Sequence, residues 1–126
     1  MPNKRLRTNS KTKKIFMKGI TNELIGASAA SMILAILKKG DNYGYEIVHS
    51  MKELTEGKLK WQEATIYPLL KHLEKDGLIK SYWKVNPGER ARKYYSIQEK
   101  GVQKLYENKE EWDTAQMIFG KLWSFE

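Results

Sequence analysis

Apolar residues recur at helical spacing over three stretches in the first part of the chain. These stretches cover residues 21–39, 43–55 and 62–76, and in each the apolar positions fall on one face of a helix. Gly40 stands between the first two stretches, and Gly77 follows the third, where a helix is expected to end. The pattern therefore predicts three amphipathic helices in succession.

After the third helix the pattern becomes that of two β-strands. Residues 78–85 and 92–97 are rich in Ile, Tyr, Trp and Val, the residue types that favour strands. Between them, Pro87 and Gly88 stand at the second and third positions of a turn, which suit these two residues. The two runs and the turn predict a β-hairpin.

The C-terminal part of the chain has the pattern of one long helix. Few turn-forming residues occur over residues 98–125, and Leu105, Trp112 and Phe119 are seven positions apart, as in a helix with a packing seam. The whole order is typical of a mainly α protein with a two-stranded β-wing: a winged helix-turn-helix domain plus a long C-terminal dimerisation helix. The order of elements alone does not establish a function.

The distribution of charged residues separates a basic segment near the N-terminus from the rest of the chain. The 126 residues contain 23 Lys and Arg against 15 Asp and Glu, a formal net charge of +8. Residues 1–22 hold seven of the basic residues and no acidic one, which leaves the rest of the chain close to neutral. We expect a basic N-terminal extension over 1–20, the winged helix-turn-helix DNA-binding domain over 21–97 and the C-terminal dimerisation helix over 98–126. The basic balance favours a polyanionic partner, either nucleic acid or an acidic membrane surface.

Enzymatic and metal chemistry is not indicated. The chain has no cysteine, which excludes a disulfide scaffold, a thiolate metal site and a cysteine nucleophile. Its two histidines, His49 and His72, lie on different predicted helices without the spacing of metal ligands. No phosphate-binding glycine loop and no set of catalytic residues can be recognised. We predict a protein that is not an enzyme and has no cofactor and no metal.

The chain is also not expected to bind or cross a membrane. Its longest uncharged run, residues 24–37, is shorter than the roughly 20 residues that a spanning helix needs. The basic start lacks a small-residue cleavage site after this run, and its charges are not interleaved with anchoring aromatic residues. We therefore expect a cytoplasmic protein.

The third helix and the hairpin carry the candidate DNA-binding residues. The apolar positions of the helix take one side and leave Thr65, Lys71 and His72 on the others, as in a recognition helix that enters the major groove. The basic residues that follow near the hairpin turn are Arg90, Arg92 and Lys93. Such groups suit contacts to phosphates or to the minor groove. The alternatives are an ordinary amphipathic helix and a solvated hairpin tip.

Four motifs strengthen the DNA-binding interpretation. They are Tyr43–Ile47, Ala64–Leu70, Leu73–Ile79 and Arg92–Tyr95. In this order they resemble the PadR family of transcriptional regulators, over a stretch from about residue 24 to 112. The resemblance implies a winged-helix homodimer that represses transcription at a palindromic operator in double-stranded DNA. By position, the DNA-binding residues that it implies are Tyr43, Thr65, Tyr67, Lys71, His72, Arg90, Arg92 and Lys93.

The short length and single C-terminal helix resemble a smaller PadR subfamily that includes multidrug-binding repressors. In those proteins a tryptophan near the middle of the last helix stacks on flat aromatic drugs at the dimer centre, and Trp112 occupies that position. The resemblance thus implies a small aromatic effector bound by Trp112. The alternative is that Trp112 only packs the dimer interface, which its heptad partners Leu105 and Phe119 fit equally well.

The sequence departs from the family pattern in three respects and leaves two hypotheses. Its basic N-terminal tail of 22 residues is longer than is usual, and either follows the DNA backbone or serves as a solubilising extension. Glu89 puts an acid beside the wing arginines, and Gln98 is a poorer cap for the last helix than threonine. The first hypothesis is a sequence-specific DNA-binding repressor that acts as a homodimer. The second is a winged-helix protein-interaction module without specific DNA binding.

Overall fold

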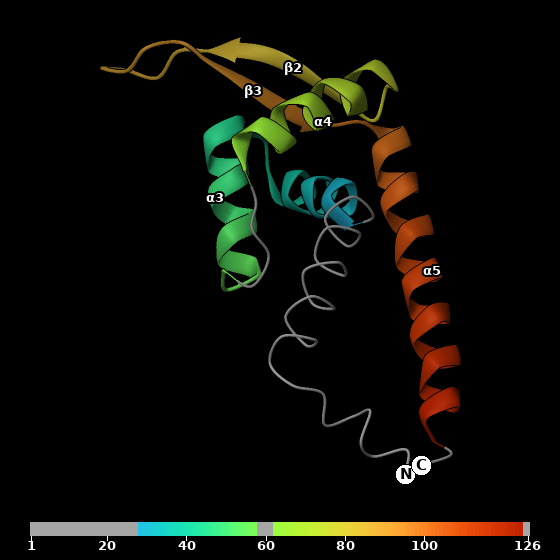
Figure 1. Ribbon diagram of the computed structural model, residues 1–126. Helices are drawn as coiled ribbons and strands as arrows, with labels where there is room; N and C mark the ends of the chain where they lie inside the picture. Colours follow the sequence, from blue (N-terminus) through green and yellow to red (C-terminus); the bar gives the residue numbers. More distant parts are fainter. Residues whose placement is uncertain (1–27, 58–61, 125–126) are drawn as a thin grey trace.

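The computed structural model describes residues 28–57 and 62–124, and Figure 1 draws the remaining residues as a thin trace. The first described element is a helix whose described part covers residues 28–39. It is followed by β1 (Asn42–Tyr43), α3 (Gly44–Leu54), α4 (Glu63–Lys75), β2 (Ile79–Lys84), β3 (Arg92–Ile97) and α5 (Glu99–Trp123). The helices and the hairpin thus agree with the sequence prediction. The beginning of the first helix and the basic extension lie outside the described residues.

The core forms where the apolar faces of the first three helices meet under the sheet. Its fully buried large side chains are Ile33, Leu34, Leu37, Ile47, Met51, Ile66, Leu70 and Ile79. Within each helix these residues recur three or four positions apart, so each helix turns one apolar stripe inward. Burying an aliphatic side chain of this size stabilises the fold by about 1.5–3 kcal/mol. In the two described ranges no polar or charged residue is buried.

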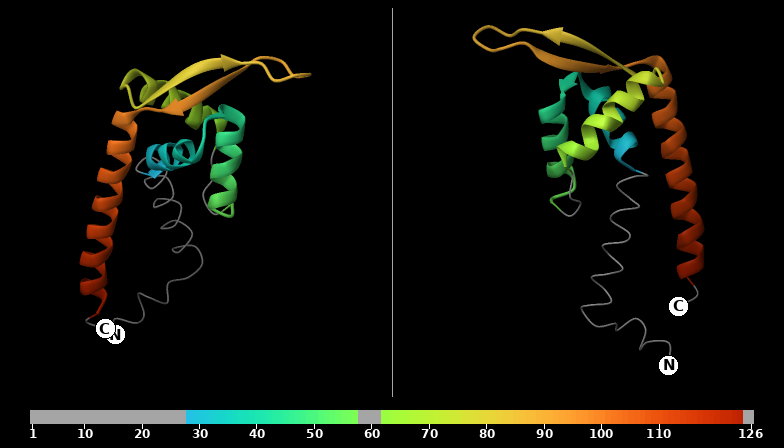
Figure 2. Two further views of the ribbon diagram at one scale, coloured as in Figure 1. Left: turned by 180° about the vertical axis from the view of Figure 1, so that it is seen from behind. Right: turned by 45° about the horizontal axis from the view of Figure 1, so that its top comes forward.

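The sheet has three antiparallel strands in the order β1-β3-β2. β2 and β3 form the predicted hairpin, in which Trp83 lies opposite Lys93. The hairpin turn closes where the Glu89 N–H donates to the Asn86 carbonyl at 3.0 Å, with Gly88 at φ 78°. This geometry requires glycine at the third position. The hairpin projects beyond α4 as a wing (Figure 1), and Figure 2 shows the same projection from behind.

The third strand, β1, is an addition to the predicted two-stranded wing. Asn42 and Tyr43 pair with Tyr95 and Tyr94 of β3. The sequence prediction placed Tyr43 at the start of the second helix, but its backbone is extended, at φ −107° and ψ 164°, and it serves as the N-cap of α3. A strand of two residues is too short to produce a recognisable period-two pattern.

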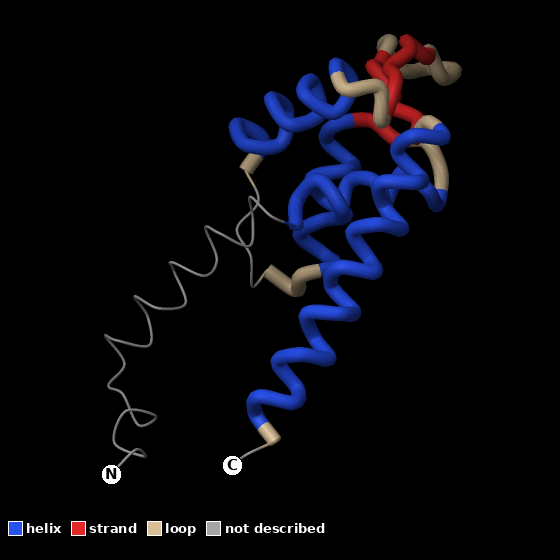
Figure 3. Tube along the Cα trace, turned by 90° about the vertical axis from the view of Figure 1, so that its right-hand side faces the viewer, coloured by secondary structure: helices blue, strands red, loops and turns tan. Residues whose placement is uncertain are grey.

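The long helix α5 starts directly at the end of the wing. A single residue, Gln98, separates β3 from α5, and its backbone N–H donates to the Leu78 carbonyl at 2.9 Å. The Gln98 side chain makes no capping hydrogen bond, which confirms that it is a poor cap. Gly101 lies so close to the Leu78 carbonyl that a larger residue would collide with it. The first turn of α5 is thus fixed to the body, and contacts to the body continue through Leu105 and Asn108, whose side-chain amide donates to the Ser31 hydroxyl at 2.7 Å. Beyond Asn108 the helix extends away from the body (Figure 3).

Candidate nucleic-acid interface

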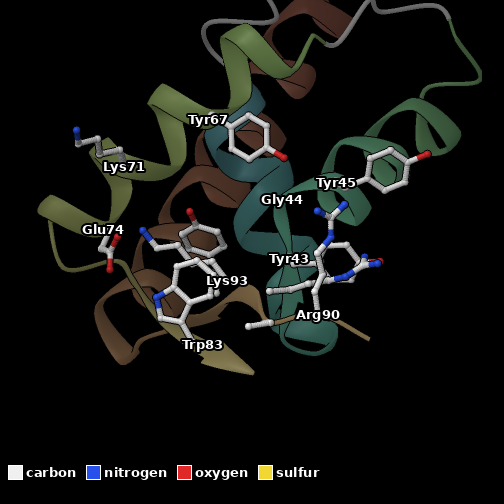
Figure 4. Close-up of a pocket in the computed structure, with 12 residues that line it drawn as sticks. Tyr43, Gly44, Tyr45, Tyr67, Lys71, Glu74, Trp83, Arg90 and Lys93 are labelled. Atoms are coloured by element: carbon white, nitrogen blue, oxygen red, sulfur yellow. The ribbon is translucent and has the colours of Figure 1, made fainter. Parts of the chain in front are cut away.

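A groove of about 930 Å³ lies between α4, the start of α3 and the wing. Among the described residues it is lined by five aromatic side chains, four cationic ones and one carboxylate. The aromatic and charged residues are Tyr43, Tyr45, Tyr67, Trp83, Tyr95, Lys71, Arg90, Arg92, Lys93 and Glu74. Figure 4 shows Trp83 and Lys93 toward one side of this groove and Tyr45 and Arg90 toward the other. The charge balance makes the groove suited to an anionic ligand.

The structure brings together six of the eight residues that the sequence nominated for DNA binding. They are Tyr43, Tyr67, Lys71, Arg90, Arg92 and Lys93. Thr65 is exposed on the first turn of α4 but does not line the groove. His72 lies beside a neighbouring shallow hollow on α4, where its Nε2 is 3.3 Å from the Asp76 carboxylate.

Arg92 and Lys93 point to opposite faces of the wing, because successive residues of a strand alternate. The Arg92 guanidinium lies 4.4 Å from the centre of the Tyr43 ring, in cation–π geometry. Tyr43 in turn contacts Tyr94 edge to face at 5.4 Å. Partial burial raises the pKa of the Tyr43 hydroxyl, against the opposing effect of Arg92. Arg92 is therefore held in place by the outer face of the sheet, whereas Lys93 lies on the same face as Trp83.

Tyr67 lies against the first residue of α3. A Cβ added at Gly44 would meet the Tyr67 ring, so glycine is what allows the ring to lie there. The ring is still 42% exposed, and its partial burial raises the pKa of its hydroxyl. Tyr67 therefore has a packing role between the two helices of the helix-turn-helix, in addition to its place at the groove.

The carboxylate among the described groove residues, Glu74, is hydrogen-bonded through one of its two oxygens. Glu74 Oε2 accepts hydrogen bonds from the Ser81 backbone N–H at 3.1 Å and from the Ser81 hydroxyl at 2.5 Å. These bonds join the last part of α4 to β2 and set the wing beside the helix. The four cations outnumber this single carboxylate, so the described lining of the groove carries a net positive charge.

Sequence reasoning did not nominate three aromatic residues of the groove, of which Tyr95 is buried and Tyr45 and Trp83 are exposed. Tyr45 is 58% exposed and stacks on His49 at a ring distance of 6.4 Å. Trp83 is 69% exposed, the highest value among the large apolar side chains that line the groove. The sequence contained one indication for Trp83. Residues two positions apart in a strand lie on the same face, so Trp83 shares the face of Ser81, which is the face that meets α4.

A second surface feature is the bare apolar part of α5. Leu105 packs against the core, but Trp112, its next heptad position, is 47% exposed. The other exposed large apolar residues farther along α5 are Met117, Ile118, Phe119, Leu122 and Trp123. Phe119 and Trp123 stack on each other at 5.3 Å. The first part of the predicted seam, at Leu105, therefore packs against the core of the same chain. The second part, from Trp112 onward, is exposed and is called the uncovered part of α5 below.

No other kind of site stands out in the described part of the chain. There, no cluster of three or more His, Asp and Glu residues is arranged to bind a metal ion. None of its helices combines the length and the apolar character that crossing a bilayer requires.

A helix-turn-helix followed by a basic β-hairpin defines the winged-helix class. Within this class, the family described as "Transcriptional regulator PadR-like family" matches residues 33–107, more than half of the chain. The chain belongs to this family, which consists of transcriptional regulators and not of enzymes. The fold that the sequence predicted is thereby confirmed.

Individual relatives agree with this membership. The transcriptional regulator YqjI of Escherichia coli is 34% identical over 80 residues, which are 64% of this chain and 37% of that protein. A PadR-like transcriptional regulator from Bacillus cereus is 30% identical, with a TM-score of 0.71 over 79% of this chain and 95% of the other. Bacillus subtilis PadR, solved in complex with operator DNA, is 29% identical, with a TM-score of 0.56 over 63% of this chain and 45% of the other. The chain thus spans less than half of YqjI and of that PadR.

Proposed function

We propose that this PadR-type regulator is a homodimeric repressor that binds a palindromic operator in double-stranded DNA through α4 and the wing. The observation that carries the proposal is the cationic groove between α4 and the hairpin, in which the one carboxylate is bound by Ser81. The similarity to a PadR solved with operator DNA supports it. The proposal places the protein in the cytoplasm, together with the DNA that it would bind.

In this proposal α4 enters the major groove and the wing follows the DNA backbone. Thr65, on the first turn of α4, and His72, on its outer side, would face base edges or phosphates, and Lys71 would meet a phosphate from the side of the groove. Lys93 and Arg90 would meet phosphates from the wing. Two copies of α4 in a symmetric dimer then require half-sites separated by roughly 34–36 Å or a multiple of this distance.

The dimer would form through the uncovered part of α5. Exposed large apolar side chains gather there, and such a patch is typical of a protein–protein contact. A second copy of the chain would cover Phe119 and its neighbours by the same residues, as a two-fold interface requires. This assigns residues 98–126 to dimerisation and residues 21–97 to DNA binding.

Trp112 would lie where a small planar effector could enter this dimer. It is half exposed, and Glu107, Glu111 and Asp113 stand within two helical turns of it along α5. An indole face beside carboxylates suits a flat aromatic cation. Release of DNA by such a ligand requires that it bind one of two dimer conformations better. If no ligand binds, Trp112 serves only to pack the interface.

The test is binding of the purified protein to its own upstream DNA and to a scrambled duplex across a salt series. We expect preference for the upstream fragment and a linear decrease of log affinity with log salt. Lys71→Ala should reduce the slope by about 0.9 if Lys71 contacts one phosphate. Lys52→Ala, which removes an exposed lysine of the last turn of α3 outside the groove, is the matched control and should leave the slope unchanged. Absence of binding to either duplex at low salt would refute the proposal and favour the protein-interaction module.

A further inference from the structure

Trp83 is an exposed aromatic residue whose position the fold itself does not explain. It lies on β2 opposite Lys93, and its side chain is 69% exposed. Nearer the base of the hairpin, the same face of the sheet is covered by α4, and Tyr95 there is only 6% exposed. Since the hairpin runs on beyond α4, the face that buries Tyr95 becomes open at Trp83.

The indole also has an unused polar group. Its N–H can only donate a hydrogen bond, and no acceptor for it is found among the described residues. An apolar ring with a free donor at its edge suits a partner that is itself part apolar and part anionic. Deoxyribose beside a phosphate has this composition.

The charges around Trp83 favour the same partner. Lys93 lies directly across the hairpin, and Lys71 lines the groove from α4. Glu74 adds one negative charge nearby, and its Oε2 accepts hydrogen bonds from Ser81, so the two lysines leave this part of the groove with a net positive charge. A DNA strand that runs between α4 and the wing would thus meet Lys71 from the helix and Lys93 from the wing, with the Trp83 indole next to Lys93 (Figure 4).

We infer that Trp83 is a DNA-contacting residue, whose indole packs on a deoxyribose of the strand in the groove and whose N–H donates to an adjacent phosphate. The inference rests on the proposed function and adds a residue to it. It also predicts that Trp83 contributes to DNA affinity in a different way from the lysines. Lys71 and Lys93 would act by releasing counterions, whereas the indole would act mainly by burying apolar surface, which salt affects little.

The experiment compares Trp83→Ala, Trp83→Phe and Val85→Ala with the unchanged protein on operator and scrambled duplexes across a salt series. Val85 is the matched control, because it is 66% exposed on the same hairpin but does not line the groove. Removal of roughly 60 Å² of buried indole surface, at about 25 cal/mol per Å², corresponds to a loss of affinity of about tenfold. We expect this loss for Trp83→Ala on both duplexes with an unchanged salt slope, a smaller loss for Trp83→Phe, and none for Val85→Ala.

Three results would overturn the inference while the unchanged protein still binds DNA. One is unchanged affinity of Trp83→Ala, the second is an equal loss for Val85→Ala, and the third is a loss explained by a lower salt slope alone. If the unchanged protein binds no DNA, the proposed function itself fails, and the two failures are thereby distinguished.

A spectroscopic measurement keeps the inference testable if Trp83→Ala does not fold. The protein has four tryptophans, which can be labelled together with 5-fluorotryptophan. The ¹⁹F resonance of Trp83 is identified by its loss in Trp83→Phe. Saturation with operator DNA should reduce the shift of this resonance between H₂O and D₂O, because the ring leaves solvent. A solvent shift unchanged by DNA would contradict the contact.

Discussion

Replacing Gly44 by alanine tests how closely α3 and α4 approach each other. A Cβ at Gly44 would lie 2.8 Å from the Tyr67 hydroxyl oxygen and still nearer to a ring carbon, well inside the usual contact distance of about 3.5–4.0 Å. The ring must therefore move away or the helices must separate. Overpacking of this kind costs about 1–3 kcal/mol, and alanine regains at most about 1 kcal/mol over glycine in a helix. We expect Gly44→Ala to lower the free energy of unfolding by about 1–2 kcal/mol.

The assay is urea unfolding followed by circular dichroism, in the unchanged protein and in a Tyr67→Ala background. Protein concentration is held constant, because the stability of a dimer depends on it. Once the Tyr67 ring is absent, Gly44→Ala should be neutral or stabilising by up to about 1 kcal/mol. Gly40→Ala is the matched control, since no atom lies within 4 Å of a Cβ built there, and it should change stability by less than about 0.5 kcal/mol.

The reasoning would be refuted by an equal cost of Gly44→Ala in both backgrounds. Such a result would show that the Tyr67 ring is not the obstacle and that the backbone of α3 itself requires glycine. A Gly44→Ala protein as stable as the unchanged one would also refute it, because the ring would then have moved without losing any packing.

Two further predictions concern stability at high pH and assembly. Burial raises the pKa of the Tyr95 hydroxyl in the folded protein above the value of about 10 in the unfolded chain, so stability is complete below pH 10 and falls as the pH rises through the folded pKa. Tyr95→Phe should flatten this decrease in urea midpoints measured from pH 9 to 11, and an equally steep decrease in both proteins would contradict it. Phe119→Glu should shift the chain from dimer to monomer in sedimentation experiments, because it puts a charge on the uncovered part of α5. Glu110→Gln, an exposed substitution on the same helix, should leave the dimer intact, and a dimer unaffected by Phe119→Glu would exclude this face as the interface.

The elements that could be predicted from the sequence are those in which apolar residues recur with a clear helical or strand period. β3 occupies the predicted range of residues 92–97, and the third helix differs from α4 by one residue at each end. Each of these elements turns one apolar face toward a common core, and this burial is what makes a period visible. β1 was not predicted, since the pairing of Asn42 and Tyr43 depends on where β3 comes to lie and not on their own pattern.

The groove could be predicted only in part for a similar reason. The cationic residues near the hairpin turn were recognised by type, but their directions follow from the register of the strands. The register places Lys93 beside Trp83 and turns Arg92 onto Tyr43. Trp83 was not nominated, because an aromatic residue in a strand is ordinarily a core residue. That Trp83 is left exposed follows only from the length of the hairpin, which extends beyond the end of α4.

The junction between the wing and α5 has a mechanical consequence. β3 passes into α5 through Gln98 alone, and the Gln98 N–H and Gly101 hold the first turn against Leu78. With no hinge at this joint, α5 acts as a lever arm of 25 residues, about 37 Å long. A tilt of about 5° at its far end would swing the wing by about 3 Å over that length. In a dimer that pivots on α5, the reach between the two wings is therefore set by the angle at which the two levers cross.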